Sequence, residues 1–169
     1  VGFGAVIRRG SWLKAGTVVQ EHAIVGHAGF FTRRRPGRAL RVIHAGGVEA
    51  GEAAEIGAFA VVFRAIHPAM TRIGARASIG TRVIVSHGCE LGEAVSIAGG
   101  ATLSGYVRVG PGAWIGPNAA VADRLSIGAG ARVAIGATLV RSIPEGAVYA
   151  GLFARPHAAM RRISRALAR

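Results

Sequence analysis

A six-residue repeat constrains this chain more than any other feature of its sequence. From residue 73 to residue 144 the sequence divides without a slip into twelve hexads, each beginning with Ile, Val or Leu. The second residue is Gly, Ala or Ser in every hexad except the last, where it is Val140, and the fifth residue is apolar. A period of six predicts a β-solenoid, in which each hexad supplies a short strand and a corner and its first residue points inward. Three hexads close one coil, and coils stack at about 4.8 Å.

The same repeat extends toward the N-terminus. It covers residues 1–30 and a second block, 42–71, in which we place the hexad starts at Val42, Val48, Ala54, Ala60 and Ile66, with Arg72 as a single-residue insertion. An inserted loop, 31–41, separates the blocks and reads FTRRRPGRALR. We therefore predict an all-β domain over residues 1–143.

The repeat pattern stops near Pro144 and Gly146, which interrupt strands. We expect a terminating loop over 144–156, followed by a basic amphipathic helix over 157–169. Met160, Ile163 and Leu167 are spaced by three and four residues in this segment, which is one helical stripe.

Composition agrees with a β-solenoid and limits the chemistry. The 26 glycines weaken any helix-bundle interpretation. Cys89 is the only cysteine, which excludes an internal disulfide and a cysteine-rich metal site. Because Cys89 is the fifth residue of its hexad, we predict that it is a small core residue and not a nucleophile. The sequence contains no uninterrupted run of 18 apolar residues, so we predict no transmembrane helix in it.

The chain is strongly basic, with 21 Lys and Arg against 8 Asp and Glu, a net charge of +13. Such a charge attracts nucleic acid, anionic membranes or acidic proteins, although a solvated basic surface is the simpler interpretation. The arginine-rich insertion lacks interleaved aromatic residues, so we do not expect nucleic-acid binding. No bound metal is expected either, because His22, His27, His44 and His67 do not have the spacing of a ligand set.

Three stretches resemble the hexapeptide-repeat acyltransferases, and among them the UDP-3-O-(3-hydroxyacyl)glucosamine N-acyltransferase family of lipid A biosynthesis. These stretches are IVGHAGFF with its following insertion and RVIHAGGVEAGEAAEIGA, VIVSHGCELGEAVSIAGGATLSGYVRVG, and RSIPEGAVYAGLFARP. The resemblance implies a left-handed parallel β-helix. It also implies a homotrimer with active sites between subunits and a cytoplasmic location, and is compatible with peripheral contact with the inner membrane.

The resemblance also implies a reaction, in which a 3-hydroxyacyl chain moves from acyl carrier protein to the amine of a UDP-3-O-acylglucosamine. The donor is carried on the phosphopantetheine of that protein, and no cofactor of the enzyme itself is needed. His87 aligns with the family's general base, and Gly105 with the glycine whose backbone N–H binds the oxyanion. Phe30 and Phe31 align with the loop that approaches the substrate, although one or both could equally anchor that loop to the solenoid. Arg124 stands where the family has a second histidine; arginine cannot act as a base, but it could bind a phosphate of the substrate.

The repeat itself brings some of these residues together. His87 and Gly105 are each third in their hexads and lie 18 residues apart, so they should sit on adjacent coils about 5 Å apart. Asp123 lies one coil further, roughly 10 Å from His87, and could contact substrate, a neighbouring subunit or only solvent. The repeat alone favours the simpler interpretation that His87 is a polar residue tolerated at an outward position.

The chain departs from the family at three points. We expect no counterpart of the family's N-terminal uridine-holding domain in this sequence, in which the repeat is already present at Val1. Gly80 and Thr81 stand where the family has a carboxylate that orients the histidine, and Arg124 replaces the second histidine. We therefore keep two alternatives: an acetyl-CoA-dependent nucleotide-sugar N- or O-acetyltransferase, and an inactive scaffold or truncated remnant.

Overall fold

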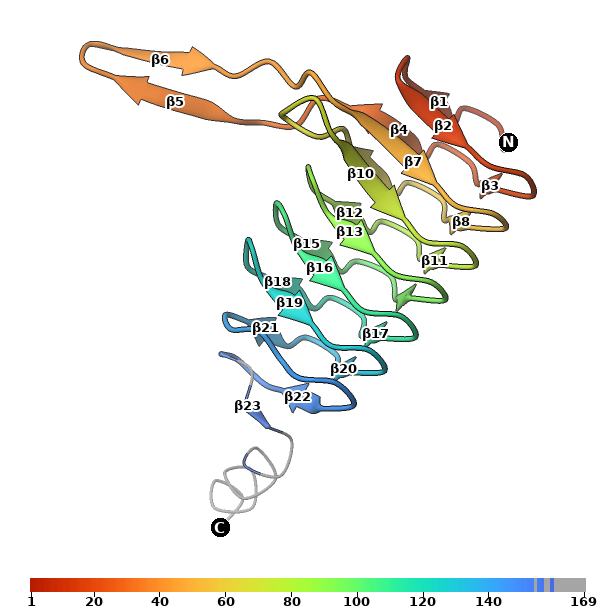
Figure 1. Cartoon of the computed structure of the whole chain (residues 1–169), viewed down its shortest axis with the longest axis vertical. Helices are drawn as coiled ribbons and strands as arrows, with labels where there is room; N and C mark the ends of the chain where they lie inside the picture. The colour runs from red at the N-terminus through yellow and green to blue at the C-terminus, as the bar shows by residue number, and fades with distance from the viewer. Residues whose placement is uncertain (154, 157–158, 160–169) are drawn as a thin grey trace.

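The computed structural model describes residues 1–153, 155–156 and 159, and these form a parallel β-helix that ends in one antiparallel pair (Figure 1). Three parallel sheets make the faces of the helix, and each coil contributes one strand to each sheet. The predicted helix over 157–169 lies almost entirely outside the described residues. No helix in the described part of the chain is long and apolar enough to cross a membrane.

Apart from an inserted hairpin and the C-terminal end, the strands of the three faces follow one another in rotation. The A sheet holds β1 (Val6–Ile7), β4 (Ile24–His27), β9 (Val61–Phe63), β12 (Ile84–Val85), β15 (Thr102–Leu103), β18 (Ala120–Val121) and β21 (Thr138–Leu139). The B sheet holds β2 (Ser11–Leu13), β7 (Gly47–Ala50), β10 (Met70–Ile73), β13 (Glu90–Leu91), β16 (Arg108–Val109) and β19 (Ser126–Ile127). The C sheet holds β3 (Val18–Val19), β8 (Glu55–Ile56), β11 (Ser78–Ile79), β14 (Ser96–Ile97), β17 (Trp114–Ile115), β20 (Arg132–Val133), β22 (Val148–Ala150) and β23 (Arg155–Pro156), the last antiparallel to β22.

The core consists of two inward columns per face, as the repeat predicts. The first residues of the twelve later hexads, such as Ile79, Val85 and Ile97, are buried, and so is nearly every fifth residue, such as Val83 and Val95. Cys89 is fully buried in a fifth-position column, which confirms the prediction that it belongs to the core. Burial raises the pKa of its thiol to about 12, so Cys89 has almost no thiolate at neutral pH.

The register that we expected for the second block is wrong by two residues. Leu13 pairs with Ala50, and Ala50 pairs with Ile73, so the first positions of this block begin at Ala50 and not at Val48. Backbone geometry agrees, because the fourth residue of most hexads has a left-handed conformation and Ala53 has a φ of 53°. Arg72 is a regular member of β10 and not an insertion.

The extra residues instead lie at one corner, where the chain passes from the A sheet to the B sheet. Later coils repeat every 18 residues, as in the pairing of Ile73 with Leu91. The coil from Leu13 to Ala50 spans 37 residues, and the coil from Ala50 to Ile73 spans 23. Two segments account for the excess: an arm between β4 and β7, and a shorter corner extension over residues 64–69.

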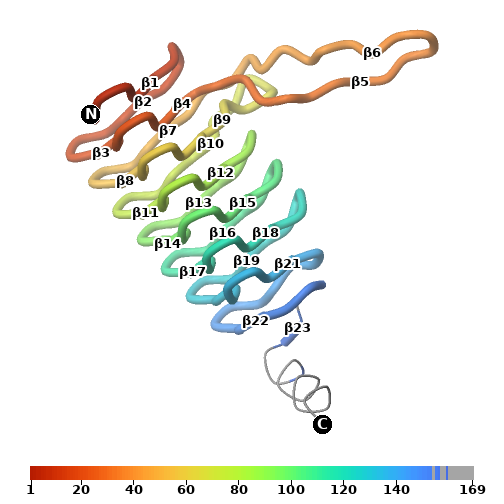
Figure 2. The backbone as a smooth tube through the Cα atoms, turned by 180° about the vertical axis from the view of Figure 1, so that it is seen from behind, coloured from red at the N-terminus to blue at the C-terminus, as the bar shows by residue number. Residues whose placement is uncertain are grey.

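The arm is a β-hairpin that projects away from the solenoid (Figure 2). Its strands β5 (Thr32–Arg35) and β6 (Arg38–Arg41) pair antiparallel, and all their residues are exposed. At its base the Val42 N–H donates a 2.9 Å hydrogen bond to the Phe31 carbonyl. The arm therefore begins over the A–B corner, where the later coils carry His87.

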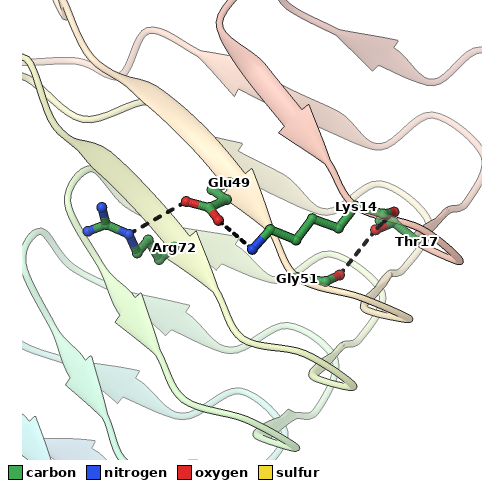
Figure 3. Close-up of polar contacts among 5 residues, drawn as sticks. All are labelled: Lys14, Thr17, Glu49, Gly51 and Arg72. Atoms are coloured by element: carbon green, nitrogen blue, oxygen red, sulfur yellow. Dashed lines mark hydrogen bonds and ion pairs between the residues drawn. The ribbon is translucent and has the colours of Figure 1, made fainter.

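The outward faces of the A and B sheets differ in character. Outward residues of the A sheet are apolar in the first coils: Val6, Ile24, Val61 and Ile84. The outward residues in the middle of the B sheet are charged, and Glu49 on β7 lies between Lys14 and Arg72 (Figure 3).

Candidate active site

Three sequence-predicted residues stack at the A–B corner of successive coils. Val85 pairs with Leu103, and Leu103 pairs with Val121, so the residues two positions after each of them fall into one column. These are His87, Gly105 and Asp123. The expected one-coil offset between His87 and Gly105 is confirmed.

The His87 ring lies directly over Gly105. A Cβ added to Gly105 would lie 2.9 Å from Cε1 and 3.0 Å from Cδ2 of His87, with Nε2 nearer still. Any side chain at residue 105 would therefore collide with the imidazole. No backbone carbonyl of the described residues accepts a hydrogen bond from the Gly105 N–H, which makes it available as a donor.

The turn that carries His87 is held by a buried threonine. The Gly88 N–H donates a 2.9 Å hydrogen bond to Oγ1 of Thr71, which is fully buried on β10. Gly88 has a φ of 67°, a conformation that favours glycine, and a Cβ there would lie 2.6 Å from Cδ1 of Tyr106. Thr71 thus holds the backbone of the turn after His87, and the Tyr106 ring packs beside the His87 imidazole.

Three aromatic rings surround the imidazole of His87. Their centroids lie 5.1 Å away for Tyr106, 5.7 Å for His44 and 5.9 Å for Phe31, and each meets His87 edge to face. His44 is only 4 % exposed, and neither of its ring nitrogens has a hydrogen-bond partner. The surroundings of His87 are therefore aromatic on several sides and poor in hydrogen-bonding groups.

This environment lowers the pKa of His87 below its ordinary value of 6.5. Burial is the largest cause, followed by the nearby His44 and Arg124, while the Asp123 carboxylate opposes the shift. Burial likewise lowers the pKa of His44. Both imidazoles are accordingly neutral at pH 7, and a neutral imidazole can accept a proton.

A cavity of about 450 Å³ opens beside His87. Its size suits a small ligand or part of a larger one. One wall comes from the arm, another from the corner extension, and the floor from the column at the A–B corner. Its lining residues are Phe31, Thr32, Arg33, Val42, Ile66, His67, His87, Gly105, Tyr106, Asp123 and Arg124.

The two phenylalanines of the insertion lie in different surroundings. Phe31 lines the cavity and contacts His87, whereas Phe30 is 88 % exposed and does not line it. The structure thus brings Phe31, but not Phe30, to the candidate site.

Asp123 and Arg124 reach the far side of the cavity. Nε of Arg124 lies 3.5 Å from Oδ2 of Asp123. The Arg124 guanidinium also stacks over the Tyr106 ring, 5.2 Å from its centroid. Neither is hydrogen-bonded to His87, and no carboxylate among the described residues orients its ring. The described residues hold no cluster of three or more metal-binding side chains.

Sequence reasoning missed Thr71, Tyr106 and His44. A signal for Thr71 existed, because it is a polar residue in an inward column with Val48, but the wrong register of the second block concealed it. Tyr106 directly follows Gly105 and was within reach of the same argument. His44 had no such signal, because its position depends on where the arm rejoins the solenoid.

No protein-family model and no curated protein matches the sequence. Several solved structures match the structure of the chain. LpxA from Acinetobacter baumannii matches 94 % of this chain and 75 % of its own, with a TM-score of 0.70 and 17 % identity. The UDP-N-acetylglucosamine acyltransferase of Francisella novicida matches 94 % of this chain and 71 % of its own, with a TM-score of 0.71 and 15 % identity. WeeI from A. baumannii AYE is 28 % identical over 64 % of this chain and 51 % of its own, with a TM-score of 0.56.

The first two likenesses cover nearly the whole of this chain. The likeness to WeeI covers about two thirds of this chain and about half of WeeI. The Francisella novicida structure is named as an acyltransferase, and at such low identity the likeness to the first two structures establishes the fold alone. The chain is a left-handed parallel β-helix of the kind found in UDP-N-acetylglucosamine acyltransferases, which confirms the predicted fold class.

Proposed function

We propose that the chain is an acyltransferase that acts on a nucleotide sugar and uses His87 as its general base. The observation that carries this proposal is the neutral imidazole of His87 lying over Gly105, whose N–H donates to no backbone carbonyl of the described residues, beside a cavity of about 450 Å³. A base and an oxyanion donor on adjacent coils are the two groups that acyl transfer from a thioester requires.

The chemistry follows from this arrangement. The acceptor amine or hydroxyl attacks the carbonyl carbon of the thioester while His87 takes the proton that the nucleophile loses. The carbonyl oxygen becomes an oxyanion and accepts a hydrogen bond from the Gly105 N–H. The carbon–sulfur bond then breaks, and His87 returns the proton to the departing thiolate. A depressed pKa suits this role, because the base starts the cycle neutral.

The substrates can be argued from the wall of the cavity and from the resemblance. Phe31, Val42 and Ile66 present apolar surface, which favours a fatty 3-hydroxyacyl donor over acetyl-CoA. Acyl carrier protein is acidic and suits the arginines of the arm. For the acceptor we propose a UDP-glucosamine derivative, either UDP-3-O-acylglucosamine or UDP-N-acetylglucosamine, the sugar nucleotide named in the Francisella novicida structure. The proposal includes a cytoplasmic location.

A homotrimer is also part of this proposal. The outward residues Val6, Ile24, Val61 and Ile84 form an apolar column on the A sheet that the described residues leave partly exposed. Exposed apolar columns of this kind mark contact surfaces between proteins. The candidate site lies at the edge of this sheet, so assembly through the A sheet would bring a neighbouring subunit close to His87.

The test is acyl transfer by the purified protein and by His87→Ala. Both donors, hydroxyacyl carrier protein and acetyl-CoA, are offered with both acceptors. Transfer by the wild type that falls at least about 10²-fold in the variant would support the proposal. Transfer from acetyl-CoA alone would support the acetyltransferase alternative. If a folded and assembled protein transfers no acyl group with any pair of substrates, the proposed enzymatic activity is contradicted and the inactive scaffold is the remaining alternative.

A further inference from the structure

A second cavity lies on the other side of the corner extension from the candidate site. Its volume is about 810 Å³, and it lies between the first coils of the B sheet and the extension. Met70 and Arg72 line it, and the buried Thr71 between them holds the turn of His87. The two cavities are therefore separated by a single stretch of chain.

An exposed indole forms one wall of this second cavity. Trp12 on β2 is 59 % exposed, and one edge of its ring lies against Gly47. A Cβ on Gly47 would lie 2.9 Å from Cζ3 of Trp12 and 3.1 Å from Cε of Met70. The absence of a side chain at Gly47 lets the ring and the methionine settle there, and this fixes the indole while much of its surface stays open to solvent.

The charged lining of the cavity is entirely cationic. Arg9, Arg64 and Arg72 line it, and no acidic residue does. Arg64 is positioned in advance, because its Nε donates to the Gly26 carbonyl at 2.7 Å and its Nη2 to the Arg9 carbonyl at 2.6 Å. A guanidinium held in this way loses little freedom when it binds an anion, and its remaining donors suit phosphate oxygens.

The nearest acidic group does not neutralise this cluster. Glu49 lies 3.7 Å from Arg72 but only 2.8 Å from Nζ of Lys14 (Figure 3). A hydrogen bond from Lys14 lowers the pKa of Glu49, so this carboxylate is already engaged at neutral pH. Arg72 thus has the longer of the two contacts with this carboxylate, and it also lines the cavity.

We infer that this second cavity binds a nucleoside diphosphate, with the base stacked on Trp12 and the phosphates bound by Arg9, Arg64 and Arg72. An aromatic face beside several guanidiniums matches the two halves of such a ligand, because bases stack on indoles and phosphates pair with arginines. The inference rests on the proposed function for the source of the nucleotide, which is either the sugar-nucleotide acceptor or the nucleotide end of coenzyme A.

The test is calorimetric titration with UDP, GDP, adenosine 3′,5′-bisphosphate and pyrophosphate. We expect Trp12→Leu and Arg72→Gln each to weaken nucleotide binding by about ten-fold or more, and Trp12→Phe to retain most of it. Matched controls are Trp114→Leu and Arg108→Gln. Trp114 lies on the C sheet under Arg132, and Arg108 lies further along the B sheet near Glu90. Both controls should bind as the wild type does. Preference for UDP or GDP would point to the acceptor, and preference for the adenosine compound to coenzyme A.

Three results would overturn the inference: no saturable binding of any nucleotide, equal binding by the wild type and a correctly folded Trp12→Leu, or pyrophosphate binding as tightly as the nucleotides. This failure is separable from failure of the proposed function. His87→Ala should lose transfer but keep nucleotide affinity. Transfer without Trp12-dependent binding contradicts this site alone, whereas Trp12-dependent binding without transfer contradicts acyl transfer alone.

Discussion

The imidazole of His87 covers the α-carbon of Gly105 one coil away, with Nε2 facing the position that a side chain would occupy. Strand pairing of Val85 with Leu103 produces this relationship, and the coil length of 18 residues fixes it. The base and the oxyanion donor are thus held by the β-helix itself and not by the arm.

We expect Gly105→Ala to reduce transfer by about 10²-fold while the fold persists, because a new methyl group would push the His87 ring out of place. The measurement is kcat/KM beside circular dichroism. Gly99→Ala is a matched control, since Gly99 is also third in its hexad and a Cβ there would meet only the Thr81 carbonyl, at 3.1 Å. Equal losses in both variants would contradict the proposed contact.

The acid side of the pH–rate profile should report the depressed pKa of His87. Because a protonated base is inactive, kcat/KM should fall only as the pH drops below the ordinary histidine value of 6.5. Asp123→Asn should move this limb to lower pH, and Arg124→Gln should move it to higher pH, since these charges act on His87 in opposite senses. A limb above 6.5, or shifts of the opposite sign, would count against His87 as the base.

The fold could be predicted because one periodicity runs through most of the chain, whereas the register of the second block could not. Positions one and five of a hexad both point inward and both carry apolar residues. A two-residue shift, from Ala50 to Val48, therefore leaves the apolar pattern almost unchanged.

The irregular segments limited the prediction of the site. His87 and Gly105 lie in the regular part of the repeat, so their approach followed from counting. The surroundings of His87 depend on irregular segments, which bring Phe31 and His44 across from the arm. No repeat encodes that placement, because it arises from packing between segments distant in the sequence.

We expect Thr71→Val to slow transfer by weakening the hold on the His87 turn. The substitution keeps the side-chain shape but removes the acceptor for the Gly88 N–H, at a cost to stability of about 1–3 kcal/mol. The comparison is with Thr102→Val, which changes an outward residue of β15. The measurements are the free energy of unfolding in urea and kcat. A Thr71→Val protein as stable and as active as the Thr102→Val protein would remove Thr71 from the site's support.

The free energy of unfolding should decrease as the pH is lowered, partly because of His44. Burial lowers its pKa in the folded state, so the unfolded chain binds a proton more readily. The free energy of unfolding should therefore be fully supported above the unfolded value of about 6.5 and decline as the pH falls toward the folded pKa. Replacing His44 with Phe should flatten this decline in denaturant titrations from pH 8 to pH 5. An unchanged slope would mean that His44 protonates equally well in the folded protein.

Assembly through the A sheet predicts that one charge will separate the subunits. Ile84 is an outward residue of β12 in the apolar column, and Ile84→Arg would place a guanidinium where three copies are proposed to meet. We expect the wild type to sediment as a trimer and Ile84→Arg as a monomer with little transfer. Ser78→Arg is the matched control, because Ser78 is an outward residue of the C sheet. If the wild type is a monomer, or if Ile84→Arg assembles as the wild type does, the A sheet is not the contact surface and the apolar column needs another explanation.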